Sequence, residues 1–383
     1  MKSMTAEQRN HMLLCDPVSR VIPKLAVPTI ISMLITNIYN MADTFFVSQL
    51  GTSASGAVGV IFSAMAIIQA VSFMIGMGAG THVSQALGAG NREKADAYAS
   101  TSFFTAFIAG VILAFFSLTN IDAVVRFLGS TETIAPYAKD YATYIFYAMP
   151  FMMCSFVMNN LLRFEGLTMY GMVGITAGGI LNIVLDPILI FALDMGTAGA
   201  ALATGIGQCI GGVVPAVYIL RQKDLPLRFA PFKFEASPIL QACANGSSEF
   251  MSNISTSFVS MLYNMQLLRM LGEDGVSAYG VLMYVQLIFI GTAIGYSIGC
   301  APIVSYHYGA GHHDELKNML KKSLTLMGIT GVALTMLALG LAAPLAKIFV
   351  GYDEGLLSLT RHAFSIFSFS FLLSGLNIFA SGF

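Results

Sequence analysis

The chain has 383 residues, of which 56% are hydrophobic and only 10% are charged, and its formal net charge is −1 at pH 7. A soluble globular domain carries about 25% charged residues, so this chain lacks the polar side chains that a water-facing surface needs. The composition therefore excludes an ordinary soluble protein and, because the apolar residues come in long blocks, indicates an all-α integral membrane protein.

The predicted elements begin with a short polar lead-in at residues 1–21, which lacks the apolar core of a signal peptide. Long apolar blocks follow, and six of them contain no Asp, Glu, Lys or Arg over roughly the 17–25 residues that cross a bilayer as a helix. The blocks show no period-two alternation, and only helices or closed barrels satisfy their backbone in lipid, so we predict helices. The ten expected spans are 22–49, 54–84, 98–120, 141–163, 167–193, 196–220, 238–268, 276–306, 323–350 and 359–383.

Lysine and arginine are distributed unevenly between the two sides that these spans define. If the N-terminus lies inside, fourteen of the 19 basic residues, Arg163 among them, fall on the inside and five fall on the outside. The positive-inside rule then predicts a multi-pass protein of the plasma membrane with a cytoplasmic N-terminus.

An internal repeat relates the second predicted span to the eighth. The tripeptide Gly-Ala-Gly at 88–90 recurs at 309–311, and the same ungapped offset of 221 residues relates Leu-Gly at 50–51 to Leu-Gly at 271–272. The offset contains six spans, an even number, so the two copies cross the membrane in the same direction, as parallel repeats. We therefore expect an N-lobe at 22–220, a basic cytoplasmic linker at 221–237 and a partial C-lobe at 238–383.

Three carboxylates lie inside predicted spans, where a charge is costly and is therefore a candidate for function. Asp43 is in the first span and follows Thr36, Tyr39 and Asn40 at the spacing of one helical face. Carboxylates flanked by hydroxyls and amides make an oxygen-rich pocket that suits a monovalent cation or a proton.

Asp186 and Glu249 are the other two intramembrane acids, in the fifth and seventh spans. Asn182 precedes Asp186 by one turn, and Pro187 lacks the N–H that would bond a carbonyl one turn back. The alternative is that each acid pairs with a buried base, although the spans of the first copy offer no evident Lys or Arg for Asp43 or Asp186.

Several sequence segments resemble the multidrug and toxic compound extrusion (MATE) family of transporters. They are NIYNMADTFFVSQLG in the first span, ALGAGNREKA after the second, LLRFEG after the fourth and NIVLDPILIF in the fifth, and the resemblance extends from Ile22 to the end of the chain. It implies two parallel six-helix repeats in a V-shaped bundle, with the second repeat incomplete and the chain truncated after the tenth of twelve helices. It also implies export of cationic or amphipathic compounds by antiport with Na⁺ or H⁺.

The resemblance also implies two groups of site residues. The cation- or proton-binding site would comprise Asp43, Asn182, Asp186, Thr204 and Tyr39, with Asp43 and Asp186 as the ligands if the ion is Na⁺. The substrate cavity would include Asn40, Asn159, Asn160 and Glu249.

The expected partners are a small drug-like substrate and the lipid bilayer, with no nucleic acid, no cofactor other than the coupling ion, and a monomeric state. A lipid-linked oligosaccharide or lipid flippase is an alternative, although its cavity should carry several Arg or Lys residues for phosphate. An ion channel is a further alternative, since polar stripes can line pores. We expect no enzyme, because the sequence shows no nucleophile–base pair or metal triad inside a span.

Overall fold

The computed structural model describes residues 6–221, 236–350 and 354–383, and within these ranges it contains helices and no strand. This confirms the predicted all-α fold. The helices are α1 (Ala6–Leu14), α2 (Val18–Ser48), α3 (Thr52–Gly88), α4 (Arg92–Thr119), α5 (Ile121–Phe127), α6 (Ala135–Phe164), α7 (Thr168–Pro187), the π-helix η1 (Ile188–Ala192), α8 (Gly196–Arg221), α9 (Ala236–Gly309), α10 (His313–Val350), α11 (Glu354–Phe367), the 3₁₀ turn η2 (Ser368–Ser370) and α12 (Phe371–Gly382).

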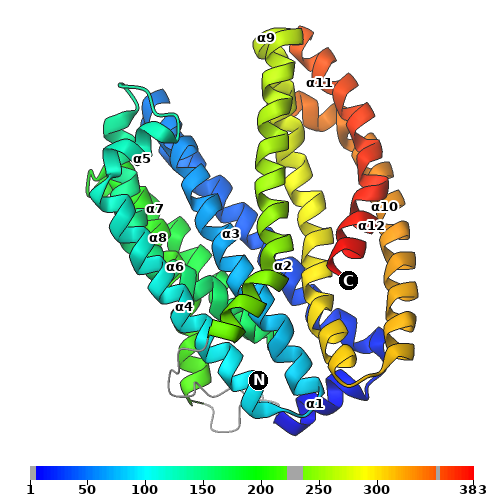
Figure 1. Cartoon of the computed structure of the whole chain (residues 1–383). Coiled ribbons are helices and arrows are strands. Elements are labelled where there is room, and N and C mark those ends of the chain that lie inside the picture. Colours follow the sequence, from blue (N-terminus) through cyan, green and yellow to red (C-terminus); the bar gives the residue numbers. More distant parts are fainter. Residues whose placement is uncertain (1–5, 222–235, 351–353) are drawn as a thin grey trace.

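Nine helical segments of the described chain are long and apolar enough to cross a membrane. The main difference from the prediction concerns α9, which contains both spans expected at 238–268 and 276–306. Of these two, only the second, as Ala278–Gly309, is among the nine segments. Only Gly272 has non-helical backbone angles inside α9 (φ 67°, ψ −153°), and the chain reverses direction within this element at the top of Figure 1. The reversal falls on a glycine because a residue without Cβ reaches positive φ without a steric clash. Most of the predicted linker at 221–237 lies outside the described residues.

The helices form two groups that diverge toward one end of the molecule (Figure 1). One group comprises α3 to α8 and the other comprises α9 to α12, while α2 packs against both α7 and α9. We call the end that carries α1 and the α3–α4 and α9–α10 turns the converged end. The opposite end, which carries α5 and the reversal of α9, is the splayed end.

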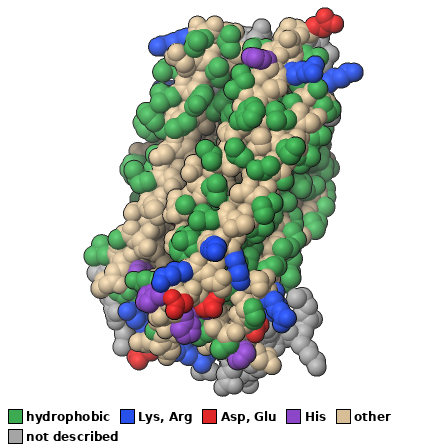
Figure 2. Space-filling model, turned by 90° about the vertical axis from the view of Figure 1, so that its right-hand side faces the viewer, with side chains coloured by type: hydrophobic (Ala, Val, Ile, Leu, Met, Phe, Trp, Pro, Cys, Tyr) green, Lys and Arg blue, Asp and Glu red, His purple; other side chains and the backbone are tan. Residues whose placement is uncertain are grey.

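The surface is that of a multi-pass membrane protein. Figure 2 shows hydrophobic side chains over the middle of the visible face, with charged side chains gathered at its two ends. Large apolar residues such as Phe115 and Met336 are each 70% exposed. Lipid tails, rather than other helices, are the medium that suits these side chains.

The internal repeat reappears as a symmetric contact at the converged end. A Cβ atom on Gly88 would lie 2.2 Å from the carbonyl oxygen of Tyr306, and a Cβ atom on Gly309 would lie 2.1 Å from the carbonyl oxygen of Gln85. Tyr306 follows Gln85 by 221 positions, the offset of the repeat. The two contacts are therefore copies of each other, and α3 and α9 approach this closely only because both positions are glycine.

The helix α1 places a buried cation at the converged end. Arg9 of α1, Glu165 in the α6–α7 turn and Tyr306 of α9 are all buried. Burial raises the pKa of Glu165 to about 8; Arg9 opposes this shift, Asp96 adds to it and Arg92 also opposes it. Glu165 therefore holds a proton at neutral pH that an exposed glutamate would have lost.

We predict that replacing Gly309 with Ala destabilises the protein. The new methyl group would meet the Gln85 carbonyl, and such overpacking costs about 1–3 kcal/mol. Thermal unfolding in detergent should show a lower midpoint for G309A. In the same helix, the Cβ site of Gly280 has no atom within 4 Å, so G280A is the matched control and should melt at or above the wild-type temperature. Equal midpoints for the two variants would contradict the close α3–α9 contact.

We predict that Glu165→Gln changes how stability depends on pH. The unfolded chain loses the Glu165 proton near its ordinary pKa of 4.5, whereas the folded protein keeps it up to about 8, so wild-type stability falls as pH rises through this window. The glutamine variant lacks this loss. The melting midpoint of the variant should match that of wild type near pH 4.5 and should exceed it above about pH 8, by roughly 2 °C or more. Parallel melting curves across the window would show that Glu165 does not titrate there.

Candidate functional site

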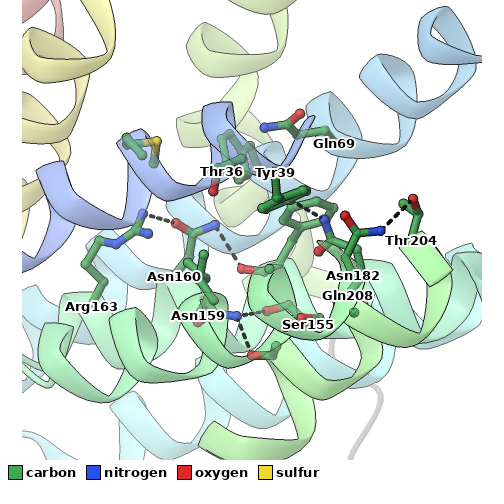
Figure 3. A pocket seen from close by; sticks show the side chains of 18 residues that line it. Thr36, Tyr39, Gln69, Ser155, Asn159, Asn160, Arg163, Asn182, Thr204 and Gln208 are labelled. Atoms are coloured by element: carbon green, nitrogen blue, oxygen red, sulfur yellow. Dashed lines mark hydrogen bonds between the residues drawn. The ribbon is translucent and has the colours of Figure 1, made fainter. Parts of the chain in front are cut away.

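A cavity lies among α2, α3, α6, α7 and α8. Its wall combines a few apolar side chains with four glycines and a larger set of polar side chains, which Figure 3 labels. The polar set is Thr36, Tyr39, Gln69, Ser155, Asn159, Asn160, Arg163, Asn182, Thr204 and Gln208. A concave pocket with convergent polar groups is the usual form of a small-molecule site.

Close packing of α7 on α8 brings the polar residues of the two helices together. A Cβ atom on Gly178 would lie 2.2 Å from the carbonyl oxygen of Gly207, so only glycine permits this approach. One turn further along α7, the Asn182 side-chain amide donates to the Thr204 hydroxyl at 3.3 Å and to Asp186 Oδ1 at 3.4 Å. Asn182 thus connects the cavity wall to a carboxylate behind it.

Asp43 and Asp186 share one site. Their side chains come from α2 and α7, are 7% and 0% exposed, and interact electrostatically with each other. The Tyr141 hydroxyl of α6 donates to Asp43 Oδ2 at 3.5 Å, and Tyr141 also interacts with Asp186 and with the Thr204 side chain. Four helices therefore converge on the two acids.

Neither acid has a basic partner among the residues that the structure describes, where the four ion pairs all involve other residues. Asp43 Oδ1, Asp186 Oδ2 and Asn182 Oδ1 are buried and accept no hydrogen bond. Buried acceptors normally have a partner, and a buried charge normally has a counter-charge. The chemistry that fits this set is the binding of a proton or of a small cation that prefers oxygen ligands.

The donor set limits what kind of metal ion could bind. Within the described ranges, no group of three or more His, Cys, Asp or Glu residues could hold a metal ion. A cation at Asp43 and Asp186 would therefore draw its further ligands from neutral oxygens, such as those of Asn182 and Thr204. Such a set of oxygen ligands suits a hard cation better than a transition metal that prefers nitrogen or sulfur ligands.

The other predicted site residues divide into two groups. Tyr39, Asn159 and Asn160 line the cavity, and the Tyr39 hydroxyl accepts a hydrogen bond from Gln208 at 2.8 Å. Asn40 and Glu249 do not line it: both are half-buried, and Glu249 lies on α9 in the other helix group. The residues predicted to form the substrate cavity are therefore not brought together as one set.

Sequence reasoning missed Tyr141 and Gln208 and did not assign Arg163 to the site. The count of basic residues placed Arg163 on the cytoplasmic side, and the structure shows that it also lines the cavity, in the last turn of α6 and 6% exposed. Gln208 could have been flagged as an amide inside a predicted span. Nothing in the sequence around Tyr141 distinguishes it from other intramembrane tyrosines.

Comparisons with known proteins agree with this architecture. The MatE family model matches residues 28–188 and 250–383. The multidrug export protein MepA of Staphylococcus aureus (strain MSSA476) is 25% identical over 376 residues, which cover 96% of this chain and 81% of that protein. MepA of Staphylococcus saprophyticus is 24% identical over 363 residues, covering 93% of this chain and 79% of that protein.

A solved structure has the same fold. It is the outward-facing conformation of a multidrug resistance MATE family transporter of the MOP superfamily, with a TM-score of 0.91 and 24% identity. The alignment covers 97% of this chain and 83% of that chain. At this level of identity, the likeness establishes the fold.

We predict that Asn182→Ala weakens cation or proton binding. The substitution removes the amide that holds Asp186 and Thr204 in place together with one of the unpartnered oxygens. Loss of such a supporting group weakens ion affinity by roughly tenfold or more. The measurement is the rise in melting temperature with added Na⁺ and, separately, with decreasing pH. Asn120→Ala, which alters an exposed side chain at the end of α4, is the control. An unchanged ion response in N182A would rule out this role.

Proposed function

Because this chain belongs to the MatE family, we propose that it is a secondary active multidrug efflux transporter. It exports cationic or amphipathic compounds in exchange for H⁺ or Na⁺, without enzymatic catalysis, and works as a monomer. The MepA relatives support multidrug export. The exchange part of the proposal rests on one observation: two buried carboxylates, which have no basic partner among the described residues, lie directly behind the wall of the cavity.

The transporter lies in the plasma membrane with its N-terminus in the cytoplasm. The excess of Lys and Arg on the side of the N-terminus supports this orientation. The converged end then faces the cytoplasm and the splayed end faces outward. In this state, a compound in the cavity is poised for release to the outside.

The coupling ion acts by changing the charge of the acid pair. Two ionised carboxylates next to each other in a low-dielectric bundle repel and need water. A proton or Na⁺ that arrives from outside neutralises part of this charge, so that the helices around Asp43 and Asp186 pack more closely and the cavity contracts. Coupling requires only that the ion and the exported compound prefer different conformations.

The helix α2 transmits this change, because it carries both Asp43 and cavity residues such as Tyr39. It also contains Pro28, which lacks an N–H and therefore leaves a carbonyl one turn back without its helical partner. The side-chain hydroxyls of Thr29 and Ser32 bond back to carbonyls of the preceding turn, an arrangement that favours bending. We assign the bend that empties the cavity to this segment.

A flippase for lipid-linked oligosaccharides or lipids is the second candidate. Its phosphate-bearing substrate would need several cations in the cavity. Arg163 is the only Lys or Arg in the described wall, which favours the drug transporter.

We predict that Asp43→Asn abolishes exchange. An amide cannot take up a proton or the charge of Na⁺, so export of a fluorescent cationic dye from liposomes against its gradient should slow by at least roughly tenfold. Imposing a pH gradient and a Na⁺ gradient in separate experiments identifies the ion. Asp314→Asn, which alters a fully exposed side chain, is the control. Full gradient-driven export by D43N would remove the proposal, and dissipation of the ion gradient without dye would indicate a channel.

A further inference from the structure

The cavity contains a buried cation that the proposed exchange cycle does not use. Arg163 lies in the last turn of α6, is 6% exposed and lines the cavity. Its Nη1 atom donates to the side-chain oxygen of Asn160 at 3.2 Å. Figure 3 shows Arg163 and Thr204 at opposite ends of the row of labelled side chains.

No acidic group neutralises Arg163 within the described part of the chain. None of the ion pairs found there includes it, and its partner Asn160 is a neutral amide that satisfies one of five N–H donors. A buried guanidinium without a counter-charge is costly, and proteins normally pair such a group. The missing negative charge can come from a molecule in the cavity.

The far end of the cavity has the opposite character. Asn182 presents an unpartnered side-chain oxygen, Thr204 contributes a hydroxyl, and Asp186 lies one hydrogen bond behind them. The lining residues of α6 alone extend from Ser155 to Arg163, which lies eight residues further along the helix, about 12 Å of helix axis at roughly 1.5 Å per residue. The cavity is therefore bipolar, with a cation at one end and oxygen acceptors at the other.

We propose that Arg163 binds a carboxylate, so that the cavity prefers small amphipathic molecules that carry a carboxylate at one end and an amine at the other. The inference rests on the proposed transport function and specifies its substrate class. A guanidinium matches a carboxylate through two parallel hydrogen bonds. A phosphate would bring more negative charge than one arginine neutralises, into a cavity that already has two acids behind its wall.

A purely structural role for Arg163 makes a different prediction. A cation in the last turn of a helix interacts favourably with the helix dipole, and its bond to Asn160 could hold that side chain in place. Loss of these contacts would weaken the binding of every ligand to a similar extent. The two roles are therefore separated by comparing ligands that differ only at the carboxylate.

The experiment measures binding of two probes to the purified protein in detergent. One probe is a fluorescent amphipathic amine that bears a carboxylate, and the other is its primary carboxamide. We expect wild type to bind the carboxylate roughly tenfold more tightly than the carboxamide, and Arg163→Gln to lose this preference. Arg163→Lys keeps the positive charge but loses the planar guanidinium group that can donate two parallel hydrogen bonds. This variant should retain part of the preference for the carboxylate probe. Arg20→Gln, which removes one exposed positive charge near the same end, should keep the full preference.

Equal affinities of wild type for the two probes, or an equal weakening of both in R163Q, would overturn the proposal. The wild-type comparison stands even if R163Q fails to fold, and the melting temperature of R163Q reports its folding. An anionic lipid headgroup is the other possible source of negative charge near Arg163. The binding measurement is therefore repeated in lipid nanodiscs with and without phosphatidylglycerol. Competitive displacement of the carboxylate probe by this lipid would also overturn the proposal. Binding needs no ion gradient, so a failure of dye export would count against the proposed function and not against the carboxylate preference.

Discussion

Two ionisable carboxylates that interact electrostatically with each other are buried in a bundle whose surface is suited to lipid. In such a medium, a charge without a counter-charge is among the most costly groups that a chain can bury. Asp43 and Asp186 lie in this position, and only Tyr141 and Asn182 hydrogen-bond to them within the described residues. The surrounding structure tolerates the pair because the hydroxyls of Tyr141 and Thr204 and the amide of Asn182, from α6, α8 and α7, converge on it. The uncompensated charge of this pair is the reason for proposing that the site binds a proton or a cation.

Glycine contacts make that convergence geometrically feasible. Gly178 and Gly207 let α7 and α8 approach until Asn182 reaches Thr204, and Gly179 leaves room for the Tyr39 ring of α2. In lipid, helices gain little hydrophobic energy from associating, so backbone approach and interhelical hydrogen bonds carry the specificity. Close backbone packing at glycine also occurs where the two repeats meet, at Gly88 and Gly309.

The helix α2 connects the site to the other half of the molecule. It carries Asp43 on one side, and near its middle Asn37 donates to the carbonyl oxygen of Leu287 in α9 at 3.1 Å. Closer to the N-terminus of α2, the α2 backbone lies directly against Gly295 and Gly299 of α9. A change in the charge of Asp43 therefore acts on an element that both helix groups share, which is the physical requirement for coupling the site to a movement of the two groups.

Much of this protein could be predicted from the sequence alone, because the relevant physics is local to each segment. The absence of charge over a bilayer's length predicts a membrane helix, and the ungapped offset of 221 predicts a parallel repeat. An acid inside an apolar block is recognisable from the sequence as a candidate functional residue. The positions of Arg163, Tyr141 and Glu249 relative to the site were decided only by the tertiary structure. Whether an arginine at a helix end faces water or a cavity, and whether a tyrosine meets a carboxylate from another helix, depends on how the helices pack against one another, and no pattern within a single helix records that.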